Sequence, residues 1–232
     1  MLFHAHMHHS NLLASDVEGY RVLGSVLPDA AITGLFGWDT LHGSERINTF
    51  ARHIAGQPHA GSLVNGLGNH HQLDSLSHDA FEGGKGYAFS HQTAALVALV
   101  GAACGITDGG TAKRITHNVI ESAVDYNLLR AKPELQAAHH QQLQTLDTER
   151  AAQWVATYTG AQPSRTAQSL ERYLQLVTAY DLAKIQGWVD LWSAVIPELL
   201  GTQVDTVQLE RALNEAVQET KKDYARLFIE AS

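Results

Sequence analysis

Two runs of metal-ligand residues at helical spacing constrain this chain more than any other feature. They are His70-x3-Asp74-x3-His78 and His117-x3-Glu121. Side chains four residues apart lie on one face of an α-helix, one turn above the other. Imidazole and carboxylate together are the ligands that Zn²⁺ and similar metals bind. The spacing therefore predicts two helices, each presenting its ligands to a common space.

The alternative for each run is a polar helix face turned to water. For the first run, a separate apolar stripe that includes Leu63, Leu67 and Leu73 already provides the packing face, and three ligand-type residues on another face need a reason. The metal interpretation is favoured there. For the second run taken alone, the two interpretations are about equal. Asp125 extends its face by one turn and would either orient His117 or bind metal directly.

Histidines also gather at the N-terminus, where the chain carries His4, His6, His8 and His9. Two explanations are open. These histidines are part of a metal site, or they are simply exposed or left from a clipped affinity tag. A single ligand near position 4, at the start of a helix, is the economical interpretation. Whether the other three, or His91 at the start of an apolar segment, also bind metal stays open.

The fold class predicted for residues 1–232 is all-α, a single-domain multi-helix bundle around a metal site. No alternating run bounded by hairpin turns is present, so strands are not expected. Residues 1–130 form the predicted metal-binding half and residues 131–232 a helical packing half. Helices are expected over 7–27, 44–54, 60–81, 92–104, 111–129, 134–159, 164–186, 187–200 and 205–230.

Composition narrows the class of partner. The formal net charge of −8 argues against long nucleic acid and against an anionic membrane surface, both of which attract basic proteins. The longest apolar stretch, residues 93–106, is too short to span a membrane. No secretory signal is visible at the N-terminus, which predicts a cytoplasmic location.

The order of the candidate ligands resembles that of the zinc-dependent phospholipase C superfamily, which includes the single-strand-specific nucleases. Members share an N-terminal His, an Asp in a Gly-Ser-x-x-Pro-Asp-like turn, a His soon after, and two helical runs like those above. Here His4 comes first, Asp29 ends the matching turn at residues 24–29, and His42 follows. Alone, Asp29 is an ordinary turn aspartate and His42 an ordinary histidine. The chain looks like a divergent bacterial relative over residues 3–125.

The resemblance implies a phosphate ester hydrolase with two or three Zn²⁺ ions, or other divalent transition metals. Such ions lower the pKa of a bound water and stabilise charge on the phosphoryl oxygens. Asp74 would bridge two metals, and Asp29 is also the candidate catalytic base. The implied metal ligands are His4, Asp29, His42, His70, Asp74, His78, His117 and Glu121.

The implied substrate is a small-molecule or lipid phosphate ester. Two alternatives stay open. One is a metal-dependent hydrolase of a non-phosphate bond such as an amide. The other is a metal-binding structural protein without turnover. A closed site, ligated only by protein, would favour the structural protein, whereas an open coordination position would favour an enzyme. The oligomeric state is not predicted.

Overall fold

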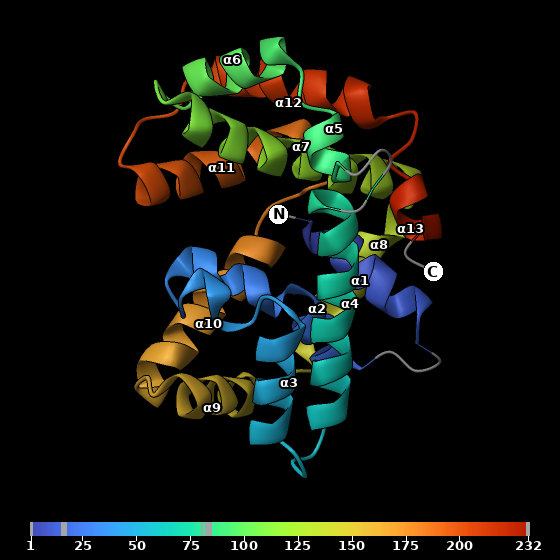
Figure 1. Ribbon diagram of the computed structural model, residues 1–232, viewed down its shortest axis with the longest axis vertical. Helices are drawn as coiled ribbons and strands as arrows, with labels where there is room; N and C mark the ends of the chain where they lie inside the picture. The colour runs from blue at the N-terminus through green and yellow to red at the C-terminus, as the bar shows by residue number, and fades with distance from the viewer. Residues whose placement is uncertain (1, 15–17, 80, 82–84, 231–232) are drawn as a thin grey trace. The chain divides into compact units, whose positions relative to one another are not determined.

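Every regular element of the described residues is a helix, which confirms the predicted all-α class. The computed structural model describes residues 2–14, 18–79, 81 and 85–230. The elements, shown in Figure 1, are α1 (Phe3–Leu12), α2 (Gly19–Val26), the 3-10 helices η1 (Leu27–Thr33) and η2 (Trp38–Thr40), α3 (Ser44–His53), α4 (Ala60–His78), α5 (Tyr87–Ser90), α6 (Ala94–Ala103), α7 (Gly109–Ala131), α8 (Glu134–Gln144), α9 (Thr148–Thr159), α10 (Pro163–Thr178), α11 (Ile185–Leu200), α12 (Thr206–Thr220) and α13 (Arg226–Glu230).

The chain divides into two compact units, each built from separate stretches of sequence. The first unit contains residues 1–5, 74–136 and 180–232, and the second contains residues 6–73 and 137–179. Each unit draws residues from both predicted halves, and the single-domain prediction stays a prediction. Across the described part of the chain, no helix combines the length and apolar character needed to cross a membrane.

Four helices form the centre of the first unit. In that unit α12 packs against α6, α7 and α11, and α6 also packs against α7 (Figure 1). Trp188 and Trp192 are fully buried, and the Trp192 indole donates a hydrogen bond to the Ser122 hydroxyl at 3.1 Å. Buried aromatic side chains of this size contribute strongly to a core. This packing fixes α7, which carries the second ligand run.

In the second unit, α2 and α4 approach so closely that their contact requires glycine. A Cβ atom on Gly24 would lie 2.1 Å from the Leu63 carbonyl oxygen, and one on Gly66 would lie 2.1 Å from the Arg21 carbonyl oxygen. Any larger residue would force the helices apart. The close contact sets the C-terminal end of α2, and η1 after it, against the helix that carries the first ligand run.

Several predicted helix boundaries were wrong. The helix expected over 7–27 is two helices, α1 and α2, and residues 15–17 of that prediction lie outside the described residues. The helix expected over 134–159 is also two, because Asp147 accepts a hydrogen bond from the Arg150 N–H and caps a new helix, α9.

The remaining boundary errors lie near the C-terminus and in the first ligand helix. The helix expected over 205–230 ends at Thr220, whose carbonyl accepts N–H groups from both Asp223 and Tyr224 in a tight turn. The helix expected over 164–186 ends at Thr178. The helix expected over 60–81 ends at His78, and most of the glycine-rich segment that was to end it, residues 82–84, lies outside the described residues.

Candidate metal centres

One group of three ligand-type side chains lies within the second unit. It contains Asp29, His42 and His70, each of which offers a ligand atom within 4.8 Å of the other two. Asp29 comes from η1, His42 from the loop after η2, and His70 from α4. Asp29 and His70 are buried, at 6% and 1% exposure. The structure thus brings together three candidate ligands that come from three different elements or loops of the chain.

Backbone carbonyls fix the tautomer of both histidines in this group. Nδ1 of His70 lies 2.9 Å from the Ser25 carbonyl oxygen, and Nδ1 of His42 bonds to the Trp38 carbonyl oxygen. A carbonyl only accepts hydrogen bonds, so each Nδ1 carries a proton, and in the neutral ring the lone pair is on Nε2. A metal-ligating histidine shows the same arrangement, with its second ring nitrogen donating to a carbonyl or carboxylate.

Two further rings hold these imidazoles in place. His6 stacks on His70 with ring centroids 4.0 Å apart, and Trp38 stacks on His42 with centroids 4.5 Å apart. Sequence reasoning left His6 open and did not identify Trp38. The signal for Trp38 was present only as its spacing four residues before His42, which lets its carbonyl meet the His42 ring.

A second group lies within the first unit and contains His78, His117 and Glu121, again with ligand atoms within 4.8 Å of one another. Nε2 of His78 is 2.9 Å from Oε1 of Glu121. The buried Ser77 hydroxyl donates to the same oxygen at 2.6 Å. Oδ2 of Asp74 lies 3.8 Å from Nδ1 of His78. The second ligand run therefore does converge with the end of the first.

Burial and neighbouring charges shift the pKa values of this group in opposite directions. Burial alone would lower the pKa of His78, but the Glu121 carboxylate and then Asp74 raise that pKa to about 9. Burial lowers the pKa of His117 to about 4 against the attraction of Glu121. Burial by itself would raise the pKa of Glu121, yet positive charge that includes His78 holds it well below its usual value. At neutral pH, His117 thus offers a lone pair while His78 carries a proton.

We expect zinc binding at the His78 group to release about one proton at pH 7, because a metal can ligate only neutral imidazole. In the metal-free protein the charged His78 pair contributes stability that is complete below the unfolded pKa of about 6.5 and is lost as the pH rises through about 9. Calorimetric zinc titrations in buffers of different ionisation enthalpy measure the release. Zinc uptake at this group with no proton release at pH 7 would contradict the His78 protonation state.

Asp125 and His4, two further candidate metal ligands, lie outside both groups. The Asp125 carboxylate accepts the backbone N–H groups of His4 at 2.9 Å and Ala5 at 2.7 Å, and so caps the start of α1. Sequence reasoning placed Asp125 on the His117 face instead. Within the described chain, neither His4 nor Asp125 belongs to a group of three converging ligands. His4 as a metal ligand and Asp74 as a bridge stay predictions.

His91 joins a separate polar cluster in the first unit. Its Nε2 lies 3.1 Å from Oδ2 of Asp223, and its Nδ1 bonds to the Tyr87 carbonyl oxygen at 2.9 Å. The Tyr87 hydroxyl donates to the other Asp223 oxygen at 2.7 Å. These contacts tie α5 to the turn after α12. His8 and His9 are buried and, among the described residues, converge with no other pair of ligands.

Both groups fit zinc by the chemistry of their donors. Each offers two imidazoles and one carboxylate, the ligand set of several catalytic zinc sites, in which a fourth position takes water or substrate. The Nδ1–carbonyl bonds of His42 and His70 supply the outer contacts that such ligands need. The first group is the better oriented of the two, because backbone carbonyls hold both of its histidines at Nδ1.

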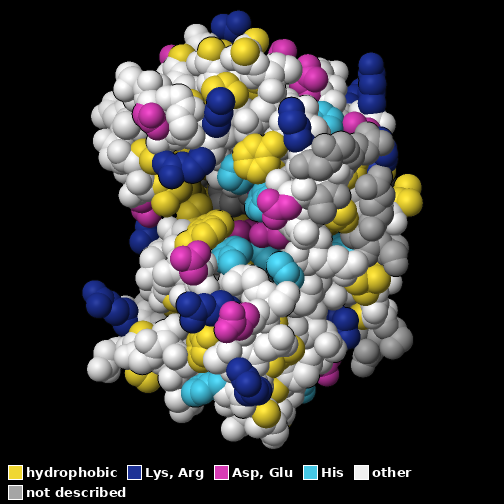
Figure 2. Space-filling model, viewed as in Figure 1, with side chains coloured by type: hydrophobic (Ala, Val, Ile, Leu, Met, Phe, Trp, Pro, Cys, Tyr) yellow, Lys and Arg dark blue, Asp and Glu magenta, His cyan; other side chains and the backbone are white. Residues whose placement is uncertain are grey.

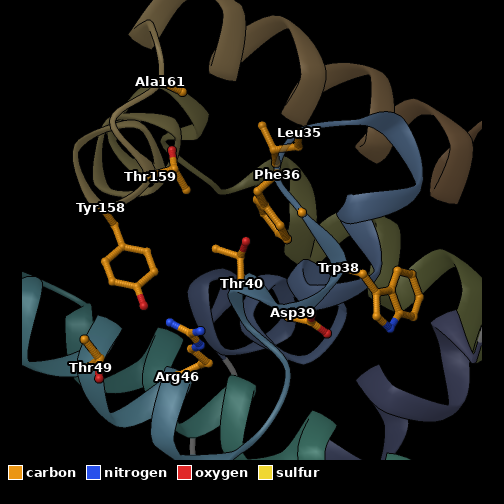
Figure 3. A pocket seen from close by; sticks show the side chains of 11 residues that line it. Leu35, Phe36, Trp38, Asp39, Thr40, Arg46, Thr49, Tyr158, Thr159 and Ala161 are labelled. Atoms are coloured by element: carbon orange, nitrogen blue, oxygen red, sulfur yellow. The ribbon is translucent and has the colours of Figure 1, made fainter.

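A cavity of about 710 Å³ opens in the second unit, which also contains the first group, and Figure 3 shows the side chains that line the cavity. Trp38 connects the two, since it lines the cavity and stacks on His42. The other lining residues come from the loop after η1, from α3 and from the end of α9. They are Leu35, Phe36, Gly37, Asp39, Thr40, Arg46, Thr49, Tyr158, Thr159 and Ala161.

Comparison with known proteins finds no matching family model, no matching curated protein and no matching solved structure. The resemblance to the zinc-dependent phospholipase C superfamily therefore rests on the order and spacing of the ligand residues.

Proposed function

We propose that this protein is a metal-dependent hydrolase of phosphate esters. The observation that carries the proposal is the Asp29–His42–His70 group, in which backbone carbonyls hold both Nδ1 protons. Three protein ligands leave an open coordination position, and an open position next to a cavity is typical of a catalytic zinc site rather than a structural one. The second group, with His78, His117 and Glu121, would hold a further ion.

Zinc bound there would lower the pKa of a bound water and offset negative charge on the phosphoryl oxygens. The protein's own residues would do the rest. His42 and His70 are held by the Trp38 and Ser25 carbonyls and would keep their orientation through the reaction. Asp29 has two carboxylate oxygens, so one can ligate while the other accepts the proton of the attacking water. The water oxygen would bond to phosphorus as the bond from phosphorus to the leaving oxygen breaks, and the leaving oxygen would take the proton from Asp29, so that the products are an alcohol and a phosphate.

The surroundings of the first group favour a phosphate ester over an amide. The Arg46 guanidinium lines the adjoining cavity. A phosphate ester carries negative charge that can pair with this cation, whereas a neutral amide does not. The substrate is expected to be small. On the face shown in Figure 2, the Lys and Arg side chains of the described residues stand apart, with Asp and Glu side chains among them. A protein that binds long nucleic acid usually carries a continuous basic surface.

A substrate panel tests the proposal. The full chain, loaded with zinc, is assayed with a phosphodiester, a phosphomonoester and an amide that release the same coloured alcohol or amine. We expect turnover of at least one phosphate ester, and loss of that turnover when a chelator is added. Hydrolysis of the amide alone would replace the proposal with the amide hydrolase alternative. Stoichiometric metal without turnover of any substrate would favour a structural metal site.

A further inference from the structure

The cavity beside Trp38 offers hydrogen-bond donors that the protein itself does not use. Among the described residues, the Arg46 guanidinium and the Thr40 and Tyr158 hydroxyls form no hydrogen bond or ion pair, although all three line the cavity. Thr49 and Thr159 differ, because they donate to backbone carbonyls within their own helices. Such a set of unused donors around one cation suits an anion.

The donors are set in a partly rigid frame. The Tyr158 ring packs edge-on against Phe50, with centroids 5.1 Å apart, and lies 5.6 Å from the His53 ring. In Figure 3 the Arg46 guanidinium and the Tyr158 hydroxyl point toward each other, and the Asp39 carboxylate extends away from them. Asp39 is the one acidic residue of the cavity lining. The cationic and acidic sides of the cavity are therefore separate.

Aromatic surface completes the cavity. Trp38 is 52% exposed and Phe36 lies at the wall. The Trp38 ring stacks on a candidate ligand, His42, and its exposed part offers a flat apolar surface at the edge of the cavity. A ligand with an apolar or aromatic body would bury that surface.

We propose that this cavity binds the non-reacting part of the substrate, and that this part carries a second anionic group, a phosphate or a carboxylate, held by Arg46 and the Tyr158 and Thr40 hydroxyls. The assignment to a substrate rests on the proposed function, whereas the binding of an anion does not. The protein would then prefer small esters with two anionic groups and an apolar body over esters whose second group is neutral or cationic.

The test uses two probes of similar shape and opposite charge, phenylphosphonate and benzyltrimethylammonium. Each is titrated into the full chain in the presence of a chelator, so that no metal holds the phosphonate, with circular dichroism as a check on folding. Trp38 provides the signal, because the other three tryptophans are at most 7% exposed. We expect saturable quenching by the phosphonate and none by the ammonium probe. The titration is repeated by calorimetry on the protein as purified.

Variants assign the binding to the cavity. Arg46→Met should weaken phosphonate binding by about tenfold or more, since a charge-assisted hydrogen bond is lost, and Tyr158→Phe should weaken it by a smaller factor. Arg211→Met, the same change on an exposed arginine of α12, should leave it unchanged. Trp38→Phe should remove the fluorescence signal and keep the calorimetric one.

Two outcomes would overturn the inference. One is an affinity for phenylphosphonate that is the same in wild type and Arg46→Met, whether it is measured with the chelator or on the protein as purified. The other is binding of the ammonium probe in place of the phosphonate, with loss in Asp39→Asn, which would make the cavity a cation site. Phosphonate binding that depends on Arg46, together with no hydrolysis of any phosphate ester, would leave the anion site standing and remove the proposed function.

Discussion

Replacing His70 with Ala is expected to lower phosphate ester hydrolysis by at least about 100-fold, because removal of a ligand costs more than the 10–100-fold loss typical of an outer contact. His70 supplies the imidazole whose Nδ1 is held by the Ser25 carbonyl. Without it, Asp29 and His42 offer only two ligands, which is too few for a stable zinc site. Steady-state kinetics at a fixed free zinc concentration and zinc affinity by competition with a chromophoric chelator measure the two effects.

His71→Ala is the matched control for that experiment. It changes the same residue type on the same helix, one position away, and His71 is not a member of any converging group in the described chain. We expect its kinetics and zinc affinity to stay close to those of wild type. Equal losses in the two variants would mean that His70 acts through helix stability, and an unchanged His70→Ala variant would remove the group from the mechanism.

Gly66→Ala is expected to lower the free energy of unfolding by about 3 kcal/mol, the upper part of the range for overpacking a well-packed interior. The new Cβ would lie 2.1 Å from the Arg21 carbonyl oxygen, 2.8 Å from the Ser25 backbone nitrogen and 2.9 Å from the Gly24 Cα. All three are backbone atoms, so no side chain can rotate away. Relief requires α2 to move off α4, which also moves the Ser25 carbonyl away from His70.

Gly68→Ala controls for helix propensity in this comparison. Gly68 lies two residues along the same helix, and its Cβ would meet no atom within 4 Å. Since Ala favours helix over Gly by about 1 kcal/mol, this variant should be slightly more stable than wild type. Urea unfolding of both variants, followed by circular dichroism, measures the difference. A Gly66→Ala variant as stable as Gly68→Ala would show that the two helices do not require their close contact.

The ligand helices were largely predictable from sequence, because i, i+4 spacing is a local property. His70 and His78 do lie on one helix, and His117 and Glu121 on another. The prediction that His70, Asp74 and His78 face a common space stays a prediction. Residues eight positions apart in a helix are about 12 Å apart along its axis, so a single ion cannot bind both histidines. The structure joins His70 to Asp29 and His42, and His78 to His117 and Glu121.

The contacts that orient the histidines were beyond reach of the sequence. The Ser25 carbonyl contacts His70 because Gly24 and Gly66 allow two helices to approach closely. Every residue has a backbone carbonyl, so the residue type does not indicate which carbonyl will bind a histidine. Asp125 illustrates the same limit. Its helical spacing from Glu121 indicated a ligand face, whereas its carboxylate accepts the N–H groups at the start of α1, more than a hundred residues away.

The metal content of the purified full chain tests the central claim most directly. Elemental analysis after removal of any affinity tag should find at least one zinc or similar divalent transition metal per chain. The content should fall in His42→Ala/His70→Ala and, where the second group is also filled, in His78→Ala/His117→Ala. A wild-type protein without stoichiometric metal after incubation with zinc, or metal content that is unchanged in both double variants, would contradict the assignment of these residues as metal ligands.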